Sequence, residues 1–595
     1  MCGILGIYPK VDSQIFNDSL KSISHRGPDN LEFVDLGTCQ FGHARLSIID
    51  TSSNANQPMT DVSGRFTLVY NGEIYNFREL RSMLIKDYNA EFRSNSDTEV
   101  ILNGFKYLGI KLFELLKGMF AIAIYDSLDD KIFLVRDKLG IKPLLYYSED
   151  GSLIFSSELK PFKVLKPNYF QVCYQSIFDF LKFGAIIQPF TIYKNIQNLE
   201  PGTVLVWDRN LGLSKIVFSK ISDKEDFNLN YTDSVNLLRN LLEKATDDHL
   251  ISDVEVGCFL SGGVDSTAVL ALMQNKVKSK VHAFSLGYED KSNILDESYI
   301  AERSAKLIGA RFTRLIVRDV DIVNTFDDFI SSLDQPTSDG FNTYLISKEA
   351  SKYVKVVLTG IGGDELFGGY SHFKEILKIK SSHNSLDFIL AKLYSFWPNR
   401  FTQKAIIRQS NNYNSIKIKR TIYSNNEISS IFSSKINSGN IDPNDLSKNS
   451  TLSYSEVKNY LLNTLLRDSD IMSMRHGLEL RPILLDDQVV DFALKAPDYF
   501  KIRGGKLKSL FIDSVHDLLP TEVLNRKKTG FELPVVVWMN GVLNQRINLL
   551  WESKSSKVYL SEKTRNSLKL KTVNKSLCQK DWQLVVLISW LEKNI

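Results

Sequence analysis

Cys2 is the first residue of the chain with a clear chemical capability. It follows the initiator methionine, and a small residue at this position permits removal of Met1, which would leave the thiol beside a free α-amine. Because the unperturbed pKa of an α-amine is about 8, the amine can act as general base toward the thiol of its own residue. Cys2 would then be a nucleophile that needs no histidine partner. The alternative is an incidental cysteine at the second position.

Two glycine-rich stretches follow later in the chain, and the first of them could bind phosphate. The sequence SGGVDS, residues 261–266, follows an apolar run and precedes the helix-like residues 267–273. Backbone N–H groups and the helix dipole at such a junction form an anion site. The sequence LTGIGGDELFGGY, residues 358–370, also begins in an apolar run. Neither is a Walker A loop, since no GxxxxGK[ST] pattern is present. A simple loop that caps a helix is the alternative for residues 261–266.

The elements that must position these residues fall into two groups. Up to about residue 207 the pattern is one of short strands broken by turns, such as residues 66–70, 120–125, 132–135 and 204–207. From residue 231 helices alternate with the apolar runs 254–260, 281–286 and 354–358, which is typical of a doubly wound parallel sheet. We therefore predict a β-rich domain over residues 2–207, a linker over 208–230 and an α/β domain over 231–595. Residues 380–450 within the second domain carry no readable motif and stay unassigned.

Composition excludes several classes of function. Of the 595 residues 43% are hydrophobic and 24% are charged, which is ordinary globular usage. The net charge is only +4 and no long run of like charges is present, so nucleic acid is not an expected partner. A basic, apolar leader and an apolar run of 18 residues are both missing from the sequence, and we expect a cytoplasmic protein that does not enter the membrane. The five cysteines are scattered without CxxC spacing, which argues against a disulfide framework or a zinc site.

Four motifs in the first hundred residues carry a resemblance to a known family. They are SHRGPD at 24–29, GHARLSIID at 42–50, YNGEIYN at 70–76 and SNSDTE at 94–99. Together with Cys2 they resemble the class II glutamine amidotransferase domain. The resemblance implies an α+β N-terminal nucleophile (Ntn) sandwich in which Cys2 attacks the side-chain amide of glutamine.

The same resemblance implies roles for further residues of this domain. Asn71 and Gly72 would supply the donors to the oxyanion. Arg45 would bind the α-carboxylate of glutamine, and Asp97, with Glu73 close by, would bind its α-ammonium. The expected glutamine-binding residues are Arg45, Leu46, Ile48, Ile49, Asn71, Gly72, Glu73 and Asp97. For the Asn71-Gly72 dipeptide alone, a type I′ hairpin turn is the alternative.

The second domain resembles the ATP pyrophosphatase half of glutamine-dependent asparagine synthetases. SGGVDS resembles the loop of enzymes that cleave ATP between its α and β phosphates, and the stretches 358–370, 470–481 and 526–531 extend the resemblance over most of the chain outside 380–450. It implies that Asp265 and Asp364 ligate Mg²⁺ together with the phosphates. Lys508 matches the family lysine that holds an acyl-phosphate, with a solvated helix lysine as the alternative. The expected ATP-binding residues are Leu260, Ser261, Gly262, Gly263, Asp265, Ser266, Leu286, Thr359 and Gly360.

Three departures from the family pattern lie in the half that chooses the acceptor. Ile361 stands where the family usually has Glu or Asp, at a position linked to activating the substrate. The stretches 470–474 (DIMSM) and 481–486 (RPILLD) also differ from the family's DRMSM and RVPFLD. The glutamine and ATP motifs are complete, so the departures bear on which carboxylate is amidated.

The resemblance implies an asparagine synthase that converts aspartate, glutamine and ATP to asparagine, glutamate, AMP and pyrophosphate through an acyl-adenylate. The first alternative is amidation of another carboxylate, such as a hexuronic acid in bacterial surface-polysaccharide synthesis. A non-catalytic scaffold or regulatory protein is an alternative of another class, although the complete motif sets weigh against it. The expected partners are small-molecule substrates with ATP and Mg²⁺, and a homodimer is possible.

Overall fold

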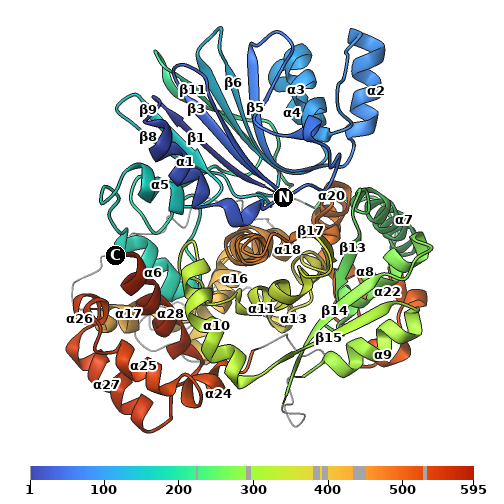
Figure 1. Ribbon diagram of the computed structural model, residues 1–595. Coiled ribbons are helices and arrows are strands. Elements are labelled where there is room, and N and C mark those ends of the chain that lie inside the picture. Colours follow the sequence, from blue (N-terminus) through green and yellow to red (C-terminus); the bar gives the residue numbers. More distant parts are fainter. Residues whose placement is uncertain are drawn as a thin grey trace.

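The computed structural model describes residues 2–222, 225–289, 296–379, 387, 389–391, 400–432, 451–526 and 533–595. Figure 1 shows a β-rich domain above and a domain with a parallel sheet below, and β17 lies at their junction. The predicted combination of an α+β sandwich with a doubly wound α/β domain is confirmed by the topology of the sheets.

The first domain is built from two six-stranded sheets with antiparallel pairing. In spatial order the first sheet contains β10 (Gln197–Asn198), β8 (Leu145–Glu149), β9 (Ser152–Ser156), β1 (Gly3–Tyr8), β3 (Gln40–Arg45) and β2 (Asn30–Asp35). The second contains β12 (Gly212–Val217), β11 (Thr203–Asp208), β7 (Lys131–Arg136), β6 (Gly118–Asp126), β5 (Phe66–Ile74) and β4 (Met59–Thr60).

The two sheets of this domain pack face to face. Ile4 and Phe41 from the first sheet and Val69 and Leu134 from the second meet in one core. Helices α1 (Ser13–Lys21) and α5 (Lys160–Leu165) cover the outer face of the first sheet, and α2 (Phe77–Tyr88) and α3 (Asp97–Leu108) cover that of the second. Strands such as β6 are therefore buried on both faces, which explains why its sequence is apolar without alternation.

The alternative interpretation of Asn71-Gly72 as a hairpin turn is wrong. Both residues lie inside β5, where Asn71 pairs with Ala121 and Gly72 pairs with Phe120 of β6. The chain instead continues straight to Ile74. The predicted strands at 120–125, 132–135 and 204–207 are confirmed as parts of β6, β7 and β11.

The second domain contains a parallel sheet in the order β15 (Arg311–Val317), β14 (His282–Tyr288), β13 (Val256–Phe259), β16 (Val356–Thr359) and β17 (Glu479–Pro482). Helices α7 (Tyr231–His249), α8 (Val264–Lys276) and α9 (Ser298–Ile308) pack on one side of it. Helices α10 (Asp319–Ser332) and α11 (Phe341–Ala350) pack on the other. The carboxyl ends of β13 and β16 lie next to each other at one edge, because the strand order reverses at this point.

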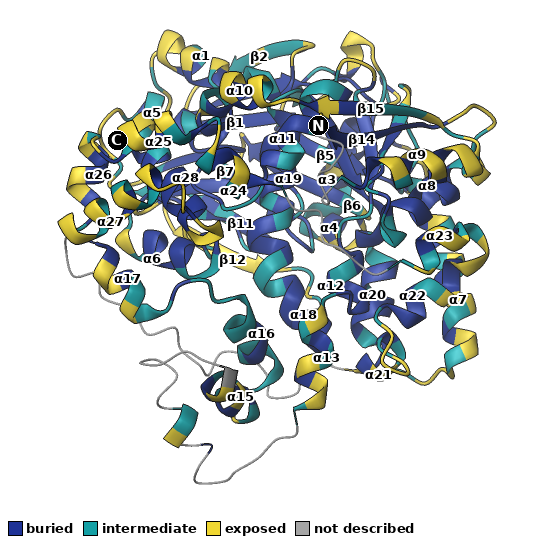
Figure 2. Ribbon diagram, turned by 90° about the horizontal axis from the view of Figure 1, so that it is seen from below, coloured by how far each residue is buried: buried dark blue, intermediate teal, exposed yellow. Residues whose placement is uncertain are grey.

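The predicted linker and the unassigned stretch both contain regular secondary structure. Strand β12 lies within the predicted linker 208–230 and pairs with β11, and α7 begins at Tyr231, where the second domain is predicted to begin. The described part of the unassigned stretch forms α15 (Arg400–Arg408), α16 (Asn412–Arg420) and α17 (Asn425–Ile431). Figure 2 shows α15 and α16 at one margin of the molecule. Residues 527–531 of the expected tail motif lie outside the described residues.

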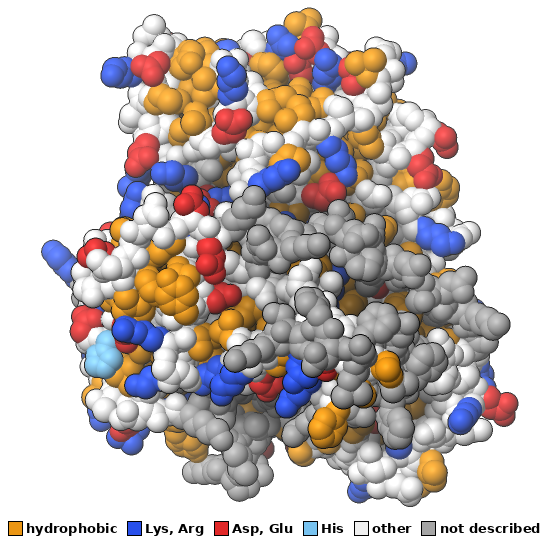
Figure 3. Space-filling view, turned by 180° about the vertical axis from the view of Figure 1, so that it is seen from behind, with side chains coloured by type: hydrophobic (Ala, Val, Ile, Leu, Met, Phe, Trp, Pro, Cys, Tyr) orange, Lys and Arg blue, Asp and Glu red, His pale blue; other side chains and the backbone are white. Residues whose placement is uncertain are grey.

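On the face in Figure 3, Lys and Arg side chains are interspersed with Asp and Glu side chains. None of the helices within the described ranges is long and apolar enough to cross a membrane.

Candidate active sites

A pocket of about 370 Å³ lies where β1, β3 and β5 of the first domain meet; we call it the cysteine pocket. It brings together Cys2 and every expected glutamine-binding residue except Asn71. Its lining residues are Cys2, Arg45, Leu46, Ile48, Ile49, Ala55, Gln57, Tyr70, Gly72, Glu73, Asp97 and Thr98.

Asn71 contacts Cys2 from the facing sheet. The backbone N–H of Cys2 donates to Asn71 Oδ1 at 2.9 Å. Asn71 Nδ2 is buried and has no hydrogen-bond partner among the described residues. An orphaned buried donor costs about 1–3 kcal/mol, so its persistence beside a cysteine is what an oxyanion donor would require.

The backbone at Gly72 accepts no larger residue. A Cβ atom at this position would overlap the carbonyl oxygen of Met119 on β6. The absence of a side chain lets β5 approach β6 closely while its other face borders the cysteine pocket.

The Cys2 thiol is buried, and burial raises its pKa, although the nearby charge of Arg45 acts in the opposite direction. At neutral pH the group is therefore a thiol, and it needs a base before it can act as a nucleophile.

Neighbouring groups hold Arg45 and Asp97 of the pocket in place through hydrogen bonds. Arg45 ends β3, and its Nη1 donates to the Ser52 carbonyl at 2.7 Å and to Asn56 Oδ1 at 2.6 Å. Asp97 begins α3, and its Oδ2 accepts from the Tyr70 hydroxyl at 2.9 Å and from the Ile74 N–H at 3.1 Å. Burial raises the pKa of Asp97, which these hydrogen bonds partly oppose.

Sequence reasoning missed Gln57 and Thr98 of the cysteine pocket. Gln57 Oε1 accepts from the Tyr70 N–H at 2.6 Å, and its Nε2 donates to Thr98 Oγ1 at 3.2 Å. Thr98 belongs to the SNSDTE motif, which could have indicated its place in the pocket. Gln57 lies outside every quoted motif.

A larger cleft, of about 2140 Å³, opens at the carboxyl ends of β13, β14 and β16; we call it the sheet-edge cleft. Several expected ATP-binding residues line it, and Gly262 and Gly263 belong to the loop beneath. The expected residues in its lining are Leu260, Ser261, Asp265, Ser266, Leu286, Thr359, Gly360, Ile361 and Asp364.

The loop after β13 is held by its own serines. Ser266 Oγ lies 2.9 Å from Ser261 Oγ and accepts from the Ser261 N–H at 3.1 Å. Gly262 adopts φ +77°, a left-handed conformation that favours glycine, and α8 begins directly after Gly263. The loop thus leads into the amino end of a 13-residue helix, where the helix dipole favours anions.

Glycines let the loop after β16 pack against the loop after β13. A Cβ on Gly360 would lie 2.8 Å from Asp265 Cβ, and one on Gly363 would lie 2.6 Å from Asp265 Cγ. This close contact brings Asp265 and Asp364 to the same point at the sheet edge.

Lys508 joins the two carboxylates. Its Nζ lies 2.5 Å from Asp265 Oδ2 and 2.5 Å from Asp364 Oδ1. Burial alone would lower the pKa of Lys508, but the two carboxylates outweigh it and raise the pKa above its ordinary value. A solvated helix lysine is therefore the wrong interpretation, since Lys508 is buried and doubly paired.

Asp265 and Asp364 fit a divalent cation. Both carboxylates converge on one positive charge, the Lys508 ammonium, and their oxygens are the ligand type that Mg²⁺ prefers. Among the described residues no cluster of three or more metal-ligating side chains is present. Mg²⁺ would thus take its other ligands from phosphate and water, as it commonly does.

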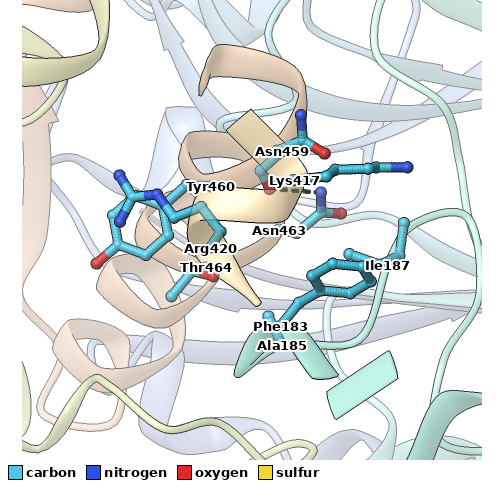
Figure 4. A pocket seen from close by; sticks show the side chains of 9 residues that line it. All are labelled: Phe183, Ala185, Ile187, Lys417, Arg420, Asn459, Tyr460, Asn463 and Thr464. Atoms are coloured by element: carbon cyan, nitrogen blue, oxygen red, sulfur yellow. Dashed lines mark hydrogen bonds between the residues drawn. The ribbon is translucent and has the colours of Figure 1, made fainter. Parts of the chain in front are cut away.

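The remaining wall of the sheet-edge cleft combines Ile361, one of the departures from the family pattern, with two tyrosines. Ile361 faces it with an apolar side chain, and Tyr370 and Tyr460 line it as well. Arg420 of α16 stacks on both tyrosines, with its Cζ 4.4 Å from the Tyr370 ring and 3.9 Å from the Tyr460 ring. Figure 4 shows the Arg420 and Tyr460 pair beside a smaller pocket. The unassigned stretch 380–450 therefore contacts two residues of this wall through Arg420, which itself lines the smaller pocket. Other unpredicted lining residues are Asp339, Asn342, Thr343, Ser371 and Lys374.

Comparison with known families agrees with this two-site layout. The sequence model of the asparagine synthase family matches residues 237–592. The glutamine amidotransferase domain matches residues 1–215.

Individual relatives are distant but span nearly the same length. Glutamine-hydrolyzing asparagine synthetase 1 of Bacillus subtilis is 28% identical and covers 100% of this chain and 97% of its own. Glutamine-hydrolyzing asparagine synthetase 3 of the same organism is 27% identical over 89% and 87% of the two chains. Amidase chry2 of Gibberella zeae is 26% identical over 89% and 87%. The chain belongs to the asparagine synthase family, whose members are ATP-dependent, and carries an N-terminal glutamine amidotransferase domain.

Proposed function

We propose that the chain hydrolyses glutamine in the cysteine pocket and uses the ammonia to amidate a carboxylate that ATP has activated in the sheet-edge cleft. One observation carries the proposal: a single chain holds Cys2 beside Asn71 in one site and Lys508 between two carboxylates in another. A scaffold protein would have no use for either arrangement.

In the first half-reaction the α-amine of Cys2, free once Met1 is removed, takes the thiol proton. The thiolate attacks the side-chain carbonyl of glutamine, and the oxyanion accepts from Asn71 Nδ2 and the Gly72 N–H. Ammonia leaves with the transferred proton, and water then cleaves the thioester to give glutamate. The Arg45 guanidinium holds the α-carboxylate of glutamine, and Asp97 and Glu73 hold its α-ammonium.

In the second half-reaction the acceptor carboxylate attacks the α-phosphorus of ATP. This gives an acyl-adenylate and pyrophosphate, and ammonia then displaces AMP to form the amide. The loop at residues 261–266 and Lys508 bind the phosphates. Asp265 and Asp364 would hold Mg²⁺, which when bound neutralises charge on the leaving pyrophosphate.

Aspartate is the acceptor that we favour, with asparagine as product. Support comes from the relatives, two of which are named asparagine synthetases and cover most of this chain. These relatives are less than 30% identical to this chain, so the identity of the acceptor is part of our proposal.

A second acceptor class is favoured by one feature of the cleft. Ile361 cannot accept a proton or a hydrogen bond, so general-base help worth about 10²–10⁴-fold must come from elsewhere. Ile361 lines the same cleft as Tyr370 and Tyr460, and together they offer packing surface to a ring. A larger carboxylate such as a hexuronic acid sugar fits these features.

The nucleotide product tests the reaction type, and the acceptor tests its specificity. The enzyme is incubated with glutamine, Mg-ATP and either aspartate or a nucleotide-linked uronic acid, and the products are separated by chromatography. We expect equal amounts of amide, AMP and pyrophosphate with one of the two acids. ADP as the main nucleotide product would contradict the proposed chemistry.

A further inference from the structure

Arg481 of the second domain contacts Glu73, which lines the cysteine pocket. It lies on β17 and is fully buried, and its Nη2 donates to Glu73 Oε2 at 2.8 Å. The other nitrogens are also used: Nε donates to Glu479 Oε1 at 2.5 Å, and Nη1 donates to the carbonyls of His249 at 2.8 Å and Ile251 at 2.6 Å. The guanidinium is therefore held rigidly from its own domain while it binds a residue of the other.

Glu73 is left with one oxygen for a ligand. Its Oε2 is taken by Arg481, whereas its Oε1 is buried and has no hydrogen-bond partner among the described residues. Glu73 also lines the cysteine pocket. A buried acceptor without a partner indicates that a donor is supplied by what binds there.

The charge of Arg481 also opposes the effect of burial on Glu73. Burial raises the pKa of the Glu73 carboxyl well above its usual range, with Asp97 and Glu479 adding to the rise, whereas Arg481 lowers it. Loss of Arg481 would leave a buried carboxyl with little reason to ionise.

The backbone of Arg481 adjoins the sheet-edge cleft. Its neighbour Leu480 lines that cleft, and Arg481 pairs with Leu358 of β16, two residues before Gly360. Leu46 and Ile48 of the cysteine pocket pack against Val356 of the same strand. The two sites thus share the strand pair β16 and β17.

We propose that Arg481 is a positioning residue of the cysteine pocket, which orients Glu73 for the α-ammonium of glutamine. This rests on the proposed glutaminase function. The second domain then completes the glutamine site, and the position of β17 relative to the first domain affects glutamine binding. A purely structural role is the alternative, in which Arg481 only stabilises the junction.

Glutaramate, which is glutamine without its α-amine, separates these possibilities. Hydrolysis of glutamine and of glutaramate is measured as kcat/KM for wild type, Arg481→Met and Arg481→Lys. We expect Arg481→Met to reduce kcat/KM for glutamine by roughly 10²-fold and to change that for glutaramate by less than about threefold, since only glutamine carries the cation. Arg481→Lys keeps the positive charge, so its kcat/KM for glutamine should fall less. If Arg481→Met does not fold, the comparison is made with Arg481→Lys.

Lys138→Met is the matched control, because it breaks another ion pair between the domains, Lys138 to Asp491 at 2.7 Å, away from the cysteine pocket. Lys138→Met should leave kcat/KM unchanged for both glutamine and glutaramate. An equal fall in kcat/KM for both substrates in the Arg481 variants would overturn the positioning role and leave the glutaminase proposal intact. Absence of hydrolysis in wild type would overturn both proposals.

Discussion

Lys508 shows how a single residue can organise a site. It adopts a left-handed backbone conformation, φ +57°, directly before α22 (Ser509–Val515), at a cost of about 1–2 kcal/mol for a residue with a Cβ. The strain is offset by two ion pairs of the buried ammonium, to Asp265 and Asp364. Strained residues cluster where function fixes geometry, so this conformation supports a role in the chemistry of the cleft.

At the residue scale we expect Asp364→Asn to separate the two activities. It removes one of the two carboxylates that face Lys508, and synthesis should fall by about 10²–10³-fold, as for loss of one electrostatic group in an active site. Glutaminase activity should remain, because Asp364 lies outside the cysteine pocket. Both rates can be followed in coupled assays, with Asp35→Asn, an exposed carboxylate, as control. Equal loss of both activities would contradict this assignment.

Single residues were predictable where a motif surrounds them. Cys2, Arg45, Glu73 and Asp97 share the cysteine pocket, as the resemblance implied, although their roles stay predictions. The contact between Glu73 and Arg481 was not predictable, because the two residues are 408 positions apart. No local pattern marks such a pair.

At the element scale the glycines decide how closely the loops approach. Gly369 follows α12 (Gly363–Phe367), and a Cβ there would overlap Asp364 Oδ1 and Lys508 Cε. The short loop therefore exists in this form only because Gly369 lacks a side chain.

We expect Gly369→Ala to displace Lys508 or Asp364 and to reduce synthesis at least tenfold, with glutaminase activity retained. Gly64→Ala is the control for backbone strain without steric overlap, since Gly64 has φ +75° but a Cβ there would meet open space. The measurement is the rate of amide formation with ammonium salts, which bypasses the cysteine pocket. Full activity of Gly369→Ala would show that the contact between the two loops is less restrictive than described.

Elements were predictable where local and tertiary preferences agree. The apolar runs at 254–260, 281–286 and 354–358 became β13, β14 and β16, because strands of a parallel sheet are buried on both faces. The Asn71-Gly72 dipeptide forms no turn, because its turn preference is weaker than the pairing of β5 along β6. The contact of α16 with two tyrosines of the cleft was not predictable, because Arg420 acts through stacking and belongs to no motif.

At the scale of the whole molecule the two domains share a buried polar junction. Arg26 is fully buried, and its nitrogens bind the Cys2 carbonyl at 3.0 Å, Glu158 at 3.1 Å and Asp470 at 2.7 Å. Asp470 belongs to the second domain, so the backbone of the predicted nucleophile is tied to the other half of the chain. This arrangement suits an enzyme that passes ammonia between sites, since ammonia released to neutral water becomes protonated and loses its nucleophilicity.

Other predictions at this scale remain open to experiment. A cytoplasmic location, a homodimer and the lack of a nucleic-acid partner were inferred from composition or from resemblance, and each stays a prediction. The domain limits 2–207 and 231–595 also stay predictions, with β12 lying between them.

The Cys2→Ala variant tests the division of labour most directly. Amide formation from the preferred acceptor and ATP is measured with glutamine and, separately, with ammonium chloride, for wild type and variant. We predict that the variant forms no amide from glutamine and keeps at least half of the wild-type rate with ammonium, because the thiol serves only the cysteine pocket. Loss of both activities in a folded variant, or synthesis from glutamine that survives the substitution, would contradict the account.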